Sequence, residues 1–166
     1  MPHEPCTLAT ERLRLRPVHA GDAAALLALF QTAFVRRFLL DDTRVELDWV
    51  IDRLRESEAM FNRLGFGLWG LFVGEGPDLI GFCGFVAEGD EPRLIYGLSE
   101  SLSGKGVARE AALAVVAFAS NRGLTPIRAS VDAENVASRA LLEALGFDVV
   151  ETSQGLLGPV LLYEKP

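Results

Sequence analysis

A run of small residues, Ser103 to Ala108, stands between a strand-like segment and a helix-like segment. The run reads Ser-Gly-Lys-Gly-Val-Ala. It follows the alternating residues 94–98 and precedes the amphipathic residues 107–121. A strand-to-helix loop gathers backbone N–H groups at the positive end of the helix dipole, and that combination binds phosphate. Gly104 and Gly106 have no side chain that would hold a pyrophosphate away from the backbone. The sequence therefore predicts a phosphate-binding loop.

Two well-known nucleotide patterns fail at this loop. A P-loop needs Ser or Thr directly after the lysine to hold magnesium, whereas Gly106 follows Lys105. The dinucleotide fingerprint fails as well, because Arg109 stands at the third glycine position. The pattern that remains is Ser-x-x-Gly-x-Ala. A glycine-rich turn that binds nothing is the alternative interpretation.

Two further motifs accompany the loop. Residues 135–147 read Asn-Val-Ala-Ser-Arg-Ala-Leu-Leu-Glu-Ala-Leu-Gly-Phe, and residues 10–17 read Thr-Glu-Arg-Leu-Arg-Leu-Arg-Pro. The three motifs together resemble the GNAT superfamily of N-acetyltransferases, whose Gln/Arg-x-x-Gly-x-Gly/Ala loop holds the pyrophosphate of acetyl-CoA. Ser103 departs from the usual Gln or Arg. The first strand, at residues 10–17, looks like that of the ribosomal-protein N-terminal acetyltransferase branch, and the resemblance covers the chain from about residue 8 to 165.

The resemblance implies acetyl-CoA as cosubstrate, bound along one strand, the loop and one helix. The strand ending at Leu98 would pair through its backbone with the pantetheine arm, and the helix that follows Asn135 would lie beside that arm. The residues assigned to acetyl-CoA in this way are Tyr96, Leu98, Ser103, Gly104, Lys105, Gly106, Val107, Ala108, Asn135, Ser138 and Arg139. Two alternatives stay open. Tyr96 also reads as a core aromatic, and Asn135 as no more than a helix N-cap.

The implied reaction is acyl transfer from a thioester to an amine, which needs a proton donor for the departing thiolate and a base for the amine. Many members of the superfamily carry a Tyr acid at the position of Leu142. We therefore assign thiolate protonation to Ser138 or to water, although a helix serine also commonly bonds back to the preceding turn. Glu100 is our candidate base. Glu91 and Asp132 are alternatives, and each of the three could equally be a solvated loop acid.

The elements that must position these residues alternate between strand and helix periodicity. The pattern predicts strands at 13–16, 67–73, 79–87, 94–98, 127–131, 149–152 and 156–163. It predicts helices from 23 through Phe34, from 43 or 44 to 64, at 107–121 and at 136–145. This order indicates a mixed α/β fold. It fits the family's central sheet of about seven strands with about four helices, splayed between strands four and five where the cofactor enters.

Length and composition narrow the class of protein. We expect one domain over residues 1–166, with 49% apolar and 23% charged residues. No apolar run reaches the ~20 residues of a membrane span. The N-terminus, Met-Pro-His-Glu-Pro, lacks the features of a signal peptide, so we expect a cytoplasmic protein. Cys6 and Cys83 give neither a metal-ligand spacing nor a disulfide framework, and Cys83 reads as a buried small residue.

The net charge of −7 argues against nucleic-acid binding. An excess of acids over residues 41–58 suits a cationic acceptor, or is only a solvated helix face. We therefore expect an acetyl-CoA-dependent N-acetyltransferase whose acceptor is a primary amine: a protein N-terminus, an amino acid or another small amine. The alternative is a CoA-binding sensor or scaffold without catalysis. A homodimer is an assembly common in the family.

Overall fold

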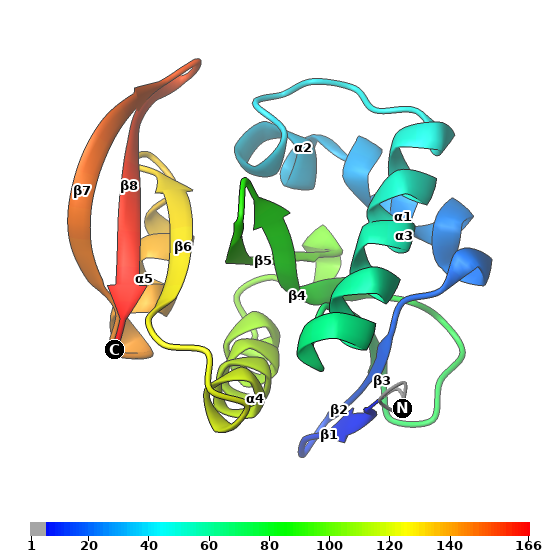
Figure 1. Ribbon diagram of the computed structural model, residues 1–166. Helices are drawn as coiled ribbons and strands as arrows, with labels where there is room; N and C mark the ends of the chain where they lie inside the picture. Colours follow the sequence, from blue (N-terminus) through cyan, green and yellow to red (C-terminus); the bar gives the residue numbers. More distant parts are fainter. Residues whose placement is uncertain (1–5) are drawn as a thin grey trace.

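One open sheet of eight strands runs through the computed structural model, which describes residues 6–166 (Figure 1). Its spatial order is β1-β2-β3-β4-β5-β6-β8-β7, and only β5 and β6 pair in parallel. The strands are β1 (Leu8–Ala9), β2 (Leu13–Pro17), β3 (Leu68–Val73), β4 (Gly81–Glu88), β5 (Glu91–Leu98), β6 (Ile127–Asp132), β7 (Asp148–Gly155) and β8 (Gly158–Lys165). All seven predicted strands are present, and the two-residue β1 is additional.

Five α-helices and two 3₁₀ helices complete the fold. They are η1 (Ala20–Asp22), α1 (Ala23–Gln31), α2 (Ala33–Leu39), α3 (Leu47–Leu64), η2 (Glu100–Leu102), α4 (Val107–Asn121) and α5 (Val136–Ala144). The first predicted helix is broken in two, because Thr32 adopts an extended backbone and its hydroxyl accepts the Val35 N–H as the N-cap of α2. The next helix begins at Leu47, three or four residues later than predicted.

The helices cover both faces of the sheet. On one face, residues of α1 and α3 pack with the sheet, and Phe30 stacks on Phe82 of β4 with ring centroids 4.8 Å apart. On the other face, Val115 of α4 and Leu142 of α5 share a core with Trp69 and Phe85. α2 belongs to the first face and contacts β5.

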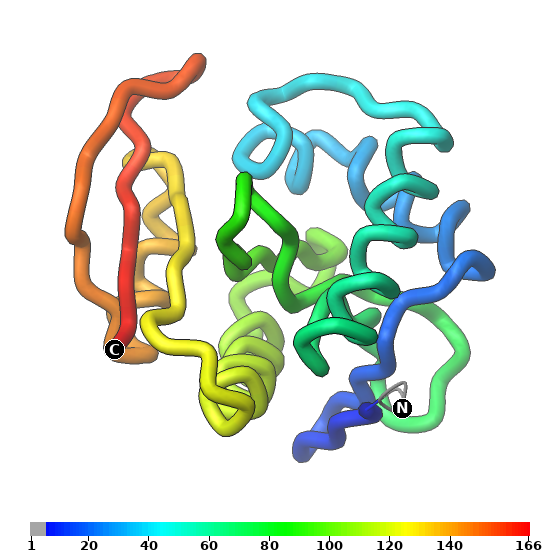
Figure 2. Tube along the Cα trace, in the orientation of Figure 1, coloured from blue at the N-terminus to red at the C-terminus, as the bar shows by residue number. Residues whose placement is uncertain are grey.

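The sheet splays between β5 and β6, as predicted for strands four and five. The two strands pair in parallel at Arg93 and Arg128, near the beginning of each. Beyond that point they diverge toward Leu98 and Asp132. The Cα trace in Figure 2 shows residues 127–166 as a separate wing beside the rest of the sheet. Figure 1 shows α2 beside the upper part of this opening.

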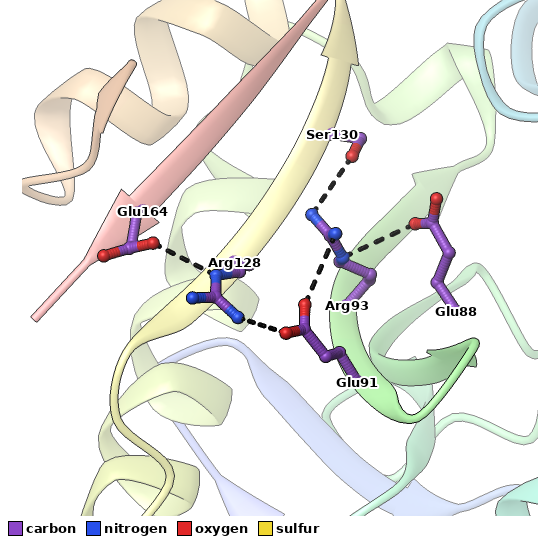
Figure 3. A network of polar contacts seen from close by, with 6 residues as sticks. All are labelled: Glu88, Glu91, Arg93, Arg128, Ser130 and Glu164. Atoms are coloured by element: carbon purple, nitrogen blue, oxygen red, sulfur yellow. Dashed lines mark hydrogen bonds and ion pairs between the residues drawn. The ribbon is translucent and has the colours of Figure 1, made fainter. Parts of the chain in front are cut away.

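A network of charged side chains joins the two halves of the sheet near the paired residues (Figure 3). Arg128 of β6 contacts Glu91 of β5 at 2.6 Å and Glu164 of β8 at 3.0 Å. Arg93 contacts the same Glu91 at 3.5 Å and donates to the hydroxyl of Ser130 at 3.4 Å. These contacts tie β5, β6 and β8 together near the beginning of β5 and β6, so the opening lies toward the carboxyl ends of the two strands.

Of two features named from the sequence, one lies inside the described range and the other outside it. Cys83 is fully buried in the core, as predicted, and its burial raises the pKa of its thiol. The first five residues, from which a signal peptide was argued to be absent, lie outside the described residues. Within residues 6–166, no helix has both the length and the apolar character needed to cross a bilayer.

Candidate active site

A cavity of about 440 Å³ opens between β5 and β6. α2 contributes Phe34 and Phe38 to its wall, β5 contributes Tyr96, and α5 contributes Ser138. Because α2 and α5 lie on opposite faces of the sheet, the cavity passes through the sheet where the strands part. It can therefore receive one molecule from each side.

The predicted phosphate loop lies at one end of this cavity, where Ser103, Gly104, Gly106 and the first turn of α4 line it. Gly104 and Gly106 have φ angles of +72° and +76°, a conformation that glycine adopts without strain. No side chain caps the start of α4, so the N–H groups of its first turn have no partner within the helix. The loop thus presents backbone donors and a helix dipole to an anion, and it fits the pyrophosphate of acetyl-CoA.

The N-terminal motif holds this loop from outside, a role that sequence reasoning missed. Arg12 donates through Nη1 to the carbonyl oxygen of Lys105 at 2.9 Å and through Nε to Glu110 of α4 at 2.8 Å. The hydroxyl of Thr10 donates to the same carboxylate. Burial alone would raise the pKa of Glu110, but the hydrogen bonds from Thr10 and Arg12 lower it below its ordinary value. Lys105 itself does not line the cavity, and its carbonyl serves as an anchor point.

We expect Arg12→Ala to weaken acetyl-CoA binding, because the loop loses its tie at Lys105. One or two hydrogen bonds of this kind correspond to a roughly two- to tenfold change in affinity. Isothermal titration calorimetry with acetyl-CoA measures it. Arg14→Ala is the matched control, since Arg14 lies on the same strand and pairs with the exposed Glu75. Equal affinities for the two variants would contradict the anchoring role.

At the middle of the cavity, two hydroxyl groups meet across the splay. Tyr96 of β5 donates from its phenol to Oγ of Ser138 at a distance of 2.9 Å. Asn135 is the N-cap of α5, and its side-chain oxygen accepts the backbone N–H of Ser138 at 3.2 Å, as the capping interpretation predicted. Burial raises the pKa of Tyr96 to about 12, so the phenol stays protonated near neutral pH and remains a donor.

The pairing brings a phenol to the cavity from β5, whereas the family resemblance implies a tyrosine on α5. Leu142, which occupies that position, is fully buried in the core and does not line the cavity. A phenol nevertheless reaches the site from β5, where it supports Ser138. Sequence reasoning named Tyr96 and Ser138 separately, and it did not find their contact.

The remaining predicted residues divide between the cavity and other places. Leu98 lines the cavity at the end of β5. Arg139 does not, because its guanidinium donates to the carbonyl oxygen of Ala133 at 3.1 Å and to the phenol of Tyr163 at 3.4 Å. Its contact with the cofactor stays a prediction. Arg109 is the basic residue that lines the cavity.

The three candidate bases have different surroundings, and none of them lines the cavity. Glu100 is exposed in η2, between Leu98 and Leu102, which line the cavity. Glu91 is held by Arg128. Asp132 ends β6 directly after Val131, which lines the cavity. Partial burial raises the pKa of Asp132, and the charges of Asp41 and Glu134 raise it further, which makes its carboxylate a stronger base.

Comparisons with known proteins agree with this geometry. Residues 12–148 match the acetyltransferase (GNAT) domain family. No curated protein sequence matches the chain. Among solved structures, an acetyltransferase from Agrobacterium tumefaciens superposes with a TM-score of 0.84 at 24% identity, over 100% of this chain and 97% of the other.

Two other structures that resemble this chain are those of acetyltransferases that act on a ribosomal protein. One is RimL, the ribosomal L7/L12 alpha-N-protein acetyltransferase, in complex with coenzyme A, with a TM-score of 0.80, 16% identity and coverage of 96% and 97%. The other, from Salmonella typhimurium, modifies the N-terminal serine of L7/L12 and has a TM-score of 0.77, 20% identity and coverage of 94% and 95%. At these identities the superpositions show a shared fold.

Proposed function

The chain belongs to the GNAT acetyltransferase family and is an acyltransferase that uses acetyl-CoA; we propose that it transfers the acetyl group directly to a primary amine. The observation that carries this proposal is the cavity through the sheet, with a phosphate loop at one end and the Tyr96–Ser138 pair within it. The acceptor is a protein N-terminus, an amino acid or another small amine. The shared fold with RimL supports a protein N-terminus among these.

Two parts of the chain would hold the cosubstrate. The start of α4, with Ser103, Gly104 and Gly106, lines the end of the cavity, and its backbone N–H groups suit a pyrophosphate. β5 past Arg93 has lost its neighbour β6, so its free edge offers backbone groups to the amides of the pantetheine arm. Bound there, acetyl-CoA supplies an acetyl group activated as a thioester.

The transfer forms a C–N bond and breaks a C–S bond, while the amine loses one proton and the sulfur gains one. Ser138 is the proton donor that we propose for the sulfur. Because its Oγ accepts the hydrogen bond from Tyr96, its own proton is free to point into the cavity. Asp132 is the proposed acceptor of the amine proton, since its carboxylate ends β6 beside the cavity and has a raised pKa.

A direct test is release of free thiol from acetyl-CoA in the presence of a panel of primary amines and N-terminal peptides. We expect thiol release that depends on the amine, together with a product heavier by one acetyl group in mass spectrometry. Calorimetry should show binding of acetyl-CoA and none of ATP. Tight binding of acetyl-CoA without transfer to any amine would favour the sensor or scaffold alternative.

A further inference from the structure

The α2 end of the cavity differs in character from the phosphate end. Building on the proposed function, we infer that this end selects primary amines that carry an apolar side chain, preferentially an aromatic one, next to the amino group. The same chemistry occurs in small aliphatic amines with an aromatic side chain and in peptides that begin with an aromatic residue.

The wall on this side is mainly apolar. Phe34, Phe38 and Leu39 of α2 and Ile95 of β5 line the cavity here, and the hydroxyl of Ser130 on β6 is a polar member of the lining. Arg109, the charged residue in the lining, stands at the opposite end beside the phosphate loop. A polar acceptor side chain would lose its water here and find few hydrogen-bond partners, whereas an apolar one would exchange water for contacts.

One ring of this wall is left partly open. Phe34 is 42% exposed, although it lies at the beginning of a helix whose neighbouring Val35 is buried. Phe38 is half-buried, and the guanidinium of Arg37 lies over its ring at 5.1 Å from the centroid. An incoming aromatic side chain would cover the exposed part of Phe34 and meet ring faces and edges, the geometry that aromatic pairs prefer.

The charges around the mouth suit an ammonium group. Arg37 of α2 reaches Glu134 at 3.4 Å, so these two charges compensate each other across the opening. Asp41, just after α2, lies close enough to Asp132 of β6 for its charge to raise the pKa of Asp132. Within residues 6–166 neither of these two carboxylates has an ion-pair partner. A protonated amine is therefore attracted to the mouth while its side chain enters an apolar pocket.

The acids of α3, which sequence analysis also connected with a cationic acceptor, lie elsewhere. Asp52 pairs with Arg55, and Glu56 pairs with Arg53; both acids are exposed. None of the acids of residues 41–58 lines the cavity. Only Asp41, at the start of this stretch, is placed to act on the acceptor.

The test compares matched acceptors that differ in one side chain. Phenylalanine amide and serine amide represent free amines, and Phe-Gly-Gly-Gly and Ser-Gly-Gly-Gly represent chain ends. We expect kcat/KM to favour phenylalanine by roughly tenfold or more in at least one pair, from burial of its ring. The pair with the higher rates identifies the source of the amine. Equal rates, or a preference for serine in both pairs, would overturn the inference and leave the proposed function intact.

A double variant tests whether the residues of this wall cause the preference for phenylalanine. Phe34→Ser combined with Phe38→Ser should reduce the phenylalanine preference to threefold or less, with acetyl-CoA affinity unchanged. Leu113→Ser is the matched control, because Leu113 is an exposed apolar residue of α4 that does not line the cavity. A preference that survives in the double variant overturns the inference.

A measurement of acceptor binding tests this inference independently of the proposed function. Saturation-transfer NMR of phenylalanine amide and serine amide with the CoA-saturated protein needs no acetyl transfer. Stronger transfer to the aromatic ligand supports the inference even if no amine is acetylated, and equal or absent binding overturns it.

Discussion

Gly106→Glu should lower acetyl-CoA affinity by roughly a hundredfold or more, because a carboxylate about 5 Å from a phosphate charge costs about 3 kcal/mol at an effective dielectric constant of about 20. The φ of +76° adds backbone strain for any residue with a side chain. Space is not limiting, since a Cβ at this position would meet only Nη2 of Arg12, at 3.5 Å. The loss therefore comes mainly from charge, and calorimetric titration with acetyl-CoA measures it.

Two variants separate charge from strain and from general instability. Gly106→Ala keeps the strain without the charge, so it should weaken binding much less. Gly123→Glu introduces the same charge just after the other end of α4, at a glycine with φ of +91° and no atom within 4 Å of its added Cβ. It should bind acetyl-CoA normally. If folded Gly106→Glu protein, checked by circular dichroism, retains affinity within threefold of the parent, the pyrophosphate does not bind at this loop.

The loop could be predicted from the sequence because its determinants are local. A strand, two glycines and the start of an amphipathic helix occur within a dozen residues, and each signal is a backbone preference. The same holds for Asn135, whose amide oxygen caps a helix three residues away. The end of α5 could also be predicted, since Gly146 takes a φ of +90° and Phe147 packs back into the core.

What sequence reasoning missed depends on partners far along the chain. Tyr96 and Ser138 are 42 residues apart, and their contact exists only because β5 and β6 part while α5 crosses beside them. Arg12 reaches the loop across 93 residues. Arg139, assigned to the cofactor from its position in a motif, also donates to a turn carbonyl and to a tyrosine of β8. One feature that sequence reasoning missed is local. The side chain of Thr32 caps α2 and so interrupts a helix that apolar periodicity alone would have continued.

Ser138→Ala should lower kcat by about 10²-fold, the lower end of general acid catalysis, because water can replace part of the lost proton donor. The KM for acetyl-CoA should change little, since the residue acts on the departing sulfur and leaves the phosphate loop untouched. Stopped-flow or steady-state detection of free thiol measures both constants. Ser130→Ala is the matched control, because Ser130 lines the same cavity and is exposed.

Tyr96→Phe distinguishes a positioned serine from a free one. In the parent protein the phenol of Tyr96 has a pKa of about 12 and is protonated near neutral pH. The Phe variant therefore loses a hydrogen-bond donor and no group that titrates in this range. We expect kcat to fall roughly three- to tenfold, as for one neutral hydrogen bond, with an unchanged pH profile between pH 6 and 9. Because the phenol acts through Ser138, the double variant should be no slower than Ser138→Ala alone. If the kcat of the double variant falls by the product of the two single reductions, Tyr96 acts on the substrate by itself. If the kcat of Ser138→Ala stays within threefold of the parent, the serine has only a structural role in the first turn of α5.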